Sequence, residues 1–168
     1  GYFPGSQKGF SPYSIEIPDH PDWYLEDEDF TLDTWVHPVS AFNYAGIAHQ
    51  NTRWYLYIDS TSKLNWYIED GSETFSMQSS GTVPLNEWSH LALTRSLEVT
   101  GSGSGQVWRM YIRGIIQDEA TENFDIPNLT GPLWIGRGTG ATDLFYGYIQ
   151  QLRLFIGKAL WTDNSNNS

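Results

Sequence analysis

The sequence predicts an all-β protein built from two antiparallel sheets packed face to face. Apolar and polar residues alternate along most segments, whereas the three-to-four-residue spacing of an amphipathic helix is nearly absent. Eight Trp, ten Tyr and eight Phe residues favour strands, because aromatic side chains fit pleated surfaces. Sixteen Gly and eight Pro residues supply turns. These signals divide the chain into about ten to twelve short strands.

Two consecutive segments, 54–58 and 64–69, predict a hairpin with one buried face. They are separated by the polar turn sequence DSTSK. One face carries the aliphatic and tryptophan side chains Trp54, Leu56, Ile58, Leu64, Trp66 and Ile68. The opposite face carries Tyr55, Tyr57, Asn65, Tyr67 and Glu69. Because side chains alternate along a strand, the second set should point away from the core.

Further strands follow from the same alternation. Residues 30–37 form one strand, and Pro38 ends it because proline cannot donate to the ladder. The segment VWRMYIRG, residues 107–114, directs Trp108, Met110 and Ile112 inward. Its opposite face carries Arg109, Tyr111 and Arg113.

Two segments predict departures from regular strand. The Gly- and Ser-rich residues 99–106 predict a flexible loop. In the closing strand the apolar residues Ile149, Leu152 and Leu154 step by three and then by two, which predicts a bulge near Gln150 and Gln151.

Length and composition predict one domain and exclude several functions. The 168 residues suit a single domain over 1–162, with the polar residues 163–168 as a tail or linker. A formal net charge of −11 repels phosphate backbones and anionic lipid, so we expect neither nucleic-acid binding nor binding to a membrane surface. No stretch of about 20 apolar residues is present, so we expect no membrane insertion. The absence of Cys removes disulfides, thiol nucleophiles and Cys-ligated zinc.

Five blocks follow one another along residues 14–162: SIEIPDHPDWYLEDEDFTLDTWVHP, LNEWSHLALTR, WRMYIRG, LWIGRG and FYGYIQQLRLFIGKALWT. In this order they resemble the laminin G-like, concanavalin A-like lectin family. The last block is most similar to versions in phage and bacterial surface proteins. The resemblance implies a jelly-roll sandwich, in which Trp88 and His90 lie on a strand covered on both faces. His90 is then a structural, hydrogen-bonded histidine rather than a catalyst.

The resemblance also raises the question of calcium. Relatives carry carboxylates in the closing strand, where this chain has Gln150 and Gln151, and amides are poorer calcium ligands than carboxylates. The acidic run 26–29 offers carboxylates elsewhere, although such a run is commonly a solvated turn. We expect the chain to require no cofactor, with a structural calcium ion as an alternative.

Catalysis is not expected, and no catalytic residue is predicted. Glycoside hydrolases typically need two carboxyl groups about 5 Å or more apart in a cleft. The Glu-x-Asp-x-x-Glu string of glucanases with this fold does not occur in the sequence. The four histidines show no metal-ligand spacing, and no Ser/His/Asp pattern is evident. A glycoside hydrolase with carboxylates from distant strands is the remaining enzymatic alternative.

The tyrosine-rich outer face predicts non-catalytic carbohydrate binding. Sugar rings stack their C–H faces on aromatic side chains, and their hydroxyls bond to planar polar groups. The predicted ligand-binding residues are Tyr55, Tyr57, Asn65, Tyr67, Arg109 and Tyr111. Trp134 and Arg113 are further candidates for the same face.

Two alternatives use the same residues. Tyr, Trp and Arg are also enriched in protein interfaces, so a structural or decoration domain could assemble through this face. The tyrosines could also simply pack as cross-strand pairs. The expected partners are therefore a glycan or host-surface polysaccharide, or other virion or surface proteins. The expected location is extracellular or on a virion surface.

Overall fold

The computed structural model describes residues 1–4, 14–40, 44–50, 53–100, 103–124, 126, 130–140 and 143–162. Side chains are described for these residues except 2–4, 99–100 and 103–104. Apart from the single 3₁₀ turn η1 (Pro21–Trp23), the regular structure of these residues consists of strands. None of the described segments forms a helix with the length and hydropathy needed to span a membrane.

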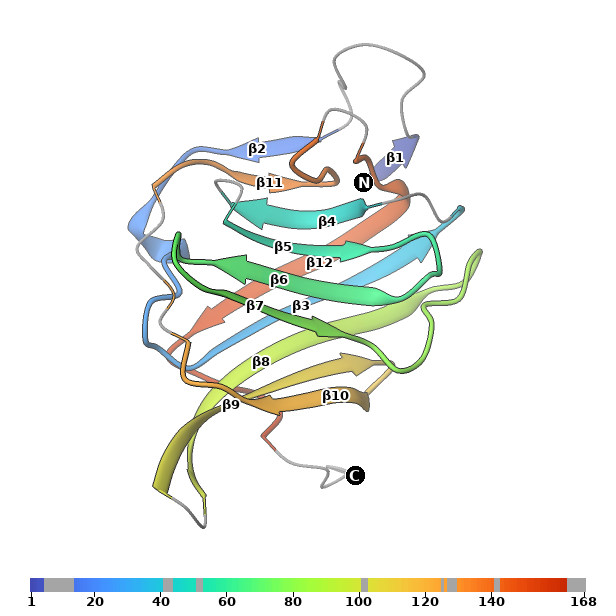
Figure 1. The fold of residues 1–168 in the computed structure, drawn as a ribbon. Helices are drawn as coiled ribbons and strands as arrows, with labels where there is room; N and C mark the ends of the chain where they lie inside the picture. Colours follow the sequence, from blue (N-terminus) through green and yellow to red (C-terminus); the bar gives the residue numbers. More distant parts are fainter. Residues whose placement is uncertain are drawn as a thin grey trace.

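The strands form two sheets of six strands each, shown as two layers in Figure 1. In spatial order, sheet A contains β1 (Tyr2–Pro4), β12 (Tyr146–Ile156), β3 (Phe30–Pro38), β8 (Ser89–Thr100), β9 (Gly103–Ile112) and β10 (Ile115–Thr121). Sheet B contains β2 (Ile15–Ile17), β11 (Leu133–Ile135), β4 (Ala45–Gln50), β5 (Trp54–Ile58), β6 (Leu64–Glu69) and β7 (Thr74–Gln78). Every neighbouring pair is antiparallel, which confirms the predicted fold class.

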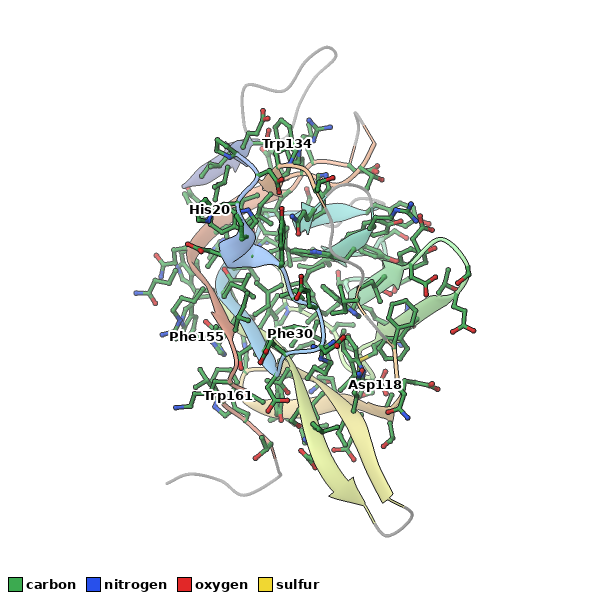
Figure 2. All side chains as sticks on the ribbon, turned by 90° about the vertical axis from the view of Figure 1, so that its left-hand side faces the viewer. His20, Phe30, Asp118, Trp134, Phe155 and Trp161 are labelled. Atoms are coloured by element: carbon green, nitrogen blue, oxygen red, sulfur yellow. The ribbon has the colours of Figure 1, made fainter. Side chains whose placement is uncertain are left out.

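The core is an aromatic cluster between the sheets. Trp66 of sheet B lies 6.4 Å from Trp108 of sheet A, measured between ring centroids. Phe30 packs edge-on against Trp108 at 5.7 Å, and Figure 2 shows it between the two layers. Trp54 extends the cluster within sheet B. All four side chains are buried, as are the aliphatic neighbours that alternation assigned to the inner face of the 54–69 hairpin.

The prediction of a flexible loop over residues 99–106 is wrong. Strands β8 and β9 remain paired as far as Thr100 and Gly103, so only residues 101 and 102 lie outside the described part. The ladder places Glu98 opposite Gly105, and the Glu98 carboxylate is ion-paired with Arg109 of β9. Cross-strand hydrogen bonds and this ion pair outweigh the low strand preference of glycine.

The two other local predictions are confirmed. Strand β3 ends at Pro38. The register between β12 and β3 shifts between Gln150 and Arg153, and Gln151 has a φ of 54°, which identifies the expected bulge.

The expected cover over Trp88 is absent, because this residue precedes β8 and is 40 % exposed. His90 is partly buried, with Nε2 3.6 Å from Oδ1 of Asp33.

The acidic run 26–29 forms part of a turn over a buried cation. The guanidinium of Arg95 lies 5.4 Å from the ring centroid of Phe30, and its Nη2 donates to the backbone carbonyls of Leu25 and Glu28. Asp29 accepts a hydrogen bond from the amide of Leu97. The run therefore anchors the start of β3 to β8.

Candidate functional site

An aromatic row crosses the outer side of sheet B. The strand registers align Trp134 of β11 with His49 of β4, His49 with Tyr55 of β5, and Tyr55 with Tyr67 of β6. Leu56, the neighbour of Tyr55 in the strand, is in the core. Because successive side chains point to opposite faces, the row points outward. We define the tyrosine face as Tyr44, Tyr55, Tyr57 and Tyr67, together with His49 and Trp134.

The tyrosine rings form a continuous series. Tyr55 and Tyr67 are stacked, with ring centroids 4.9 Å apart and an interplanar angle of 10°. Tyr57 lies 6.2 Å from Tyr55 and 5.1 Å from Tyr44. Tyr44 is the most open member, with 54 % of its surface exposed. The series gives a ligand several adjacent ring surfaces rather than a single one.

A pocket of about 290 Å³ opens at one end of this series. Its lining residues are Tyr44, Tyr55, Tyr57, Gly138, Thr139 and Asp143. The wall opposite the tyrosines is the loop after β11, which lies directly on β4 at Gly46. A Cβ atom at Gly46 would be 2.1 Å from the backbone nitrogen of Gly138. Glycine at this position therefore allows the close approach that shapes the pocket.

Asp143 holds that loop in place. Its Oδ2 accepts a hydrogen bond from the amide of Gly140 at 2.8 Å. Its backbone carbonyl accepts from the amides of Gly138 and Gly46. The carboxylate that lines the pocket thus also organises its wall.

The phenol groups of Tyr55 and Tyr57 stay protonated at neutral pH, because the pKa of each is raised. Burial, together with nearby Tyr67 and Glu69, raises the pKa of Tyr55 to about 12. Burial, Tyr44 and Asp59 also raise the pKa of Tyr57. A protonated phenol both donates and accepts hydrogen bonds, which is what recognition of sugar hydroxyl groups requires.

His49 is the buried, neutral member of the row. Burial lowers its pKa, and its ring is parallel to that of Trp134 at 6.4 Å. Its Nδ1 lies 3.0 Å from the carbonyl oxygen of Arg137. Since a carbonyl can only accept, we assign the proton of the neutral ring to Nδ1. Arg137 in turn lies over the Trp134 ring, with its Cζ 4.5 Å from the centroid.

Asn65 is on the predicted face but is engaged within the protein. It is buried, and its Nδ2 donates to Oδ2 of Asp59 and to the carbonyl of Lys63. Its Oδ1 accepts from Gln78. These contacts brace the turn between β5 and β6, so the side chain supports the face from below.

The expectation that Tyr111 and Arg109 share a face with the other tyrosines is wrong. Both are on β9 of sheet A, on the opposite side of the sandwich. Tyr111 is only 4 % exposed, and its hydroxyl donates to the carbonyl of Trp161 in the C-terminal segment, labelled in Figure 2. Arg109 is buried between Glu98 and Glu119. Alternation identified the outer side of β9 correctly, but it carries no information on which sheet contains the strand.

Sequence reasoning missed Tyr44, His49 and the wall residues around Asp143. The available signal was Gly46, which the register places opposite Tyr57. A glycine within a strand often marks close approach of another backbone. Trp134, named as a further candidate, does share the tyrosine face, whereas Arg113 belongs to sheet A at the turn after β9.

Among the described residues, no group of three His, Cys, Asp or Glu side chains is placed so that it could hold a metal ion. In the acidic run, Glu26, Asp27 and Glu28 are exposed, and Asp29 is hydrogen-bonded to β8. The structural calcium ion stays a prediction without a candidate ligand set in this part of the chain.

Several solved structures share the fold. The chain is similar to domain 4 of AbnA, a GH43 extracellular arabinanase from Geobacillus stearothermophilus solved with arabinotriose, with a TM-score of 0.65 and 17 % identity over 86 % of this chain and 66 % of that one. A pentraxin from Limulus polyphemus is similar with a TM-score of 0.61 and 16 % identity, over 91 % of this chain and 73 % of that one. The CBM40 of a Ruminococcus gnavus sialidase, bound to α2,3 sialyllactose, is similar with a TM-score of 0.56 and 13 % identity, over 89 % of this chain and 91 % of that one.

At these identities the structural likeness establishes the fold alone. No curated protein sequence matches the chain significantly. A sequence model of a laminin G family, which is described as the concanavalin A-like lectin/glucanases superfamily, matches residues 13–161. This match covers most of the chain. The chain therefore belongs to the concanavalin A-like lectin/glucanase superfamily.

Proposed function

We propose that the protein is a non-catalytic carbohydrate-binding module that takes a sugar ring into the pocket of the tyrosine face. The observation that carries this proposal is the lining of the pocket by three adjacent tyrosines, Tyr44, Tyr55 and Tyr57. Their rings offer apolar surfaces for the C–H face of a sugar, and their hydroxyls offer hydrogen bonds. Tyr67 extends the same surface along β6.

The similar structures support this choice of ligand class. The arabinanase domain was solved with arabinotriose and the CBM40 with sialyllactose. A pocket of about 290 Å³ is at the lower end of the size range of small-molecule sites, which favours a terminal or single sugar unit over a long buried chain.

The pocket chemistry supports binding without catalysis. Among the described residues that line it, Asp143 alone carries a carboxylate, and this group is hydrogen-bonded to Gly140. Hydrolysis of a glycosidic bond typically uses two carboxyl groups placed on either side of the scissile bond. The lining residues provide rings and hydroxyls instead.

We further propose an extracellular or virion-surface setting, with a host-surface polysaccharide as partner. The net charge of −11 suits a protein that must stay soluble in a crowded exterior environment. The arabinanase that contains the similar domain is itself described as extracellular.

The first experiment is a glycan array followed by calorimetry, with Tyr44→Ala, Tyr57→Ala and Tyr57→Phe as variants. We expect a glycan to bind wild-type protein, and each alanine variant to weaken binding roughly tenfold through loss of ring contact. Tyr57→Phe keeps the ring and should lose less affinity than Tyr57→Ala. Repeating the array with calcium and with chelator tests whether the metal contributes.

The array can also reject the proposal. Binding to no glycan under either condition would remove the carbohydrate function. If the protein instead oligomerises in solution and Tyr44→Ala prevents it, the face is an assembly surface. Glycan binding that survives both alanine variants would place the site elsewhere on the molecule.

A further inference from the structure

A second aromatic groove lies on the outer side of sheet A, on the opposite face of the sandwich from the tyrosines. Its volume is about 510 Å³, and its lining residues are Trp35, Trp88, His90, Arg113, Gly114 and Arg153. We call it the tryptophan groove. This volume is within the 300–1,000 Å³ range of small-molecule sites.

Local sequence accounts for how the groove is built. Trp35 of β3 is opposite His90 of β8, and their rings are 5.3 Å apart. Arg113 and Gly114 connect β9 to β10, with φ values of 53° and 76°. Positive φ at both central residues is the signature of a type I′ turn. The turn brings Arg113 next to Trp88, to whose carbonyl it donates a hydrogen bond.

Trp88 leaves an apolar surface open to solvent. It is 40 % exposed, although it contacts His37 and Tyr148 at ring distances of 5.5 and 6.2 Å. Tyr148 is exposed to a similar degree. Tryptophan is a residue that interfaces use as an anchor, so an open indole beside a groove indicates a binding surface.

The two arginines of the groove are held by very different carboxylates. Arg153 makes a two-point contact, at 2.9 and 3.1 Å, with Asp33, whose side chain is 1 % exposed. Arg113 pairs at 2.7 Å with Glu87, whose side chain is 61 % exposed. A surface ion pair contributes little stability, so Glu87 can leave Arg113 at small cost. Asp33 is buried and cannot withdraw from Arg153 in this way.

We propose that the tryptophan groove binds a carboxylated saccharide. The sugar ring would stack on Trp88, and its carboxylate would replace Glu87 on the Arg113 guanidinium, which can bind a carboxylate through two parallel hydrogen bonds. Arg153, fixed by Asp33, adds a second guanidinium to the lining of the groove. A neutral sugar would gain the stacking but not this exchange of carboxylates.

This second site is independent of the tyrosine face. None of the described residues that line it belongs to sheet B, and the two sites point in opposite directions. One molecule with both sites occupied would bridge two glycan chains and bind a surface with avidity.

Calorimetry with two matched pairs of probes tests the proposal. The pairs are sialyllactose against lactose, and trigalacturonate against its methyl ester. We expect at least one acidic probe to bind more tightly than its neutral partner by tenfold or more. Failure of both acidic probes to bind, or equal affinity for acidic and neutral members, overturns the proposal.

Three variants then locate the site. Trp88→Ala should abolish acidic-probe binding, and Arg113→Asn should reduce its affinity to that of the neutral probe while keeping a favourable Asn-Gly turn. Glu87→Gln removes the competing carboxylate and should raise affinity about twofold to fivefold. Unchanged affinity in Arg113→Asn, or a loss in Glu87→Gln, contradicts the exchange mechanism.

Tyr57→Ala separates this proposal from the first one. It alters the tyrosine face alone, so acidic-probe binding should persist in this variant even if the tyrosine face binds no glycan. Loss of acidic-probe binding in Tyr57→Ala would assign that binding to the tyrosine face and overturn the second site.

Discussion

Arg95 is a charged side chain that is buried within the apolar core. Its guanidinium packs against Phe30 and Trp108 and donates to the carbonyls of Leu25 and Glu28. Arg95→Ala should lower the free energy of unfolding by about 3 kcal/mol, because it leaves a cavity and buried carbonyls without this donor. Urea denaturation measures the change.

Two further variants separate packing from hydrogen bonding at this position. Arg95→Met fills the space but cannot donate, so its loss should be smaller than that of Arg95→Ala. Arg53→Ala removes a half-exposed arginine paired with Glu69 at 3.7 Å and should change stability by less than about 1 kcal/mol. If Arg95→Ala is no more destabilising than Arg53→Ala, the buried cation has no structural role.

Residue by residue, the candidate site could be predicted only in part. Period-two alternation was enough to place Tyr55, Tyr57 and Tyr67 on an outer face, since strand geometry alone decides this. It could not show that Tyr111 is covered, because the covering Trp161 is fifty residues away in sequence. Nor could it show that the side-chain amide of Asn65 donates a hydrogen bond to Asp59 across the turn.

At the scale of elements, Gly46 couples strand β4 to the loop that walls the tyrosine pocket. A Cβ at this position would meet the backbone of Arg137 and Gly138 at 2.1 to 2.4 Å, so the loop must move. Gly46→Ala should destabilise the fold by about 1–3 kcal/mol and weaken glycan binding, because the pocket wall is displaced. Thermal unfolding and calorimetry on the same variant measure both effects.

Gly114→Ala is the matched control for this substitution. A Cβ at Gly114 meets no atom of the described residues within 4 Å, but the φ of 76° disfavours any side chain. The expected cost is about 1–2 kcal/mol from the backbone alone, with tyrosine-face binding unchanged. Wild-type glycan affinity in Gly46→Ala would mean that the loop wall takes no part in the site.

Elements were predictable where local rules dominate and were missed where distant partners dominate. Proline chemistry ends β3 at Pro38, and broken alternation locates the bulge near Gln151. By contrast, the ribbon of β8 and β9 continues through a glycine-rich stretch, because the opposite strand supplies its hydrogen bonds. Sequence composition indicates only the local strand preference of each residue, so it does not show the hydrogen bonds that the opposite strand supplies.

For the whole molecule, the pattern of alternation and turns gave the two-layer architecture, but it did not assign strands to sheets. Strands β5, β6 and β7 are neighbours both in sequence and in sheet B, whereas β11 and β12 are consecutive but lie in different sheets. Hairpins follow from short turns, while crossovers between layers depend on packing across the core. This is why the sequence could not show that Arg109 and Tyr111 lie on the other side of the sandwich from Tyr55, Tyr57 and Tyr67.

The tyrosine face also sets how the stability of the whole molecule responds to alkaline pH. Folding raises the pKa of Tyr55 from 10.0 to about 12, so the folded protein holds this proton more tightly than the unfolded chain does. The contribution is fully present below pH 10 and is lost as pH rises through 12. Over this range each deprotonation also adds negative charge to a chain whose net charge is already −11 at pH 7.

We therefore expect the free energy of unfolding to fall between pH 10 and pH 12. Tyr55→Phe removes one titrating group from the row and should make this fall less steep than in the wild type. Urea denaturation at intervals across the range gives both slopes, and lysine titration cancels in the comparison because it is common to the two proteins. Parallel slopes would mean that the Tyr55 phenol titrates as it does in the unfolded chain, and that its burial against Tyr67 does not stabilise the protonated form.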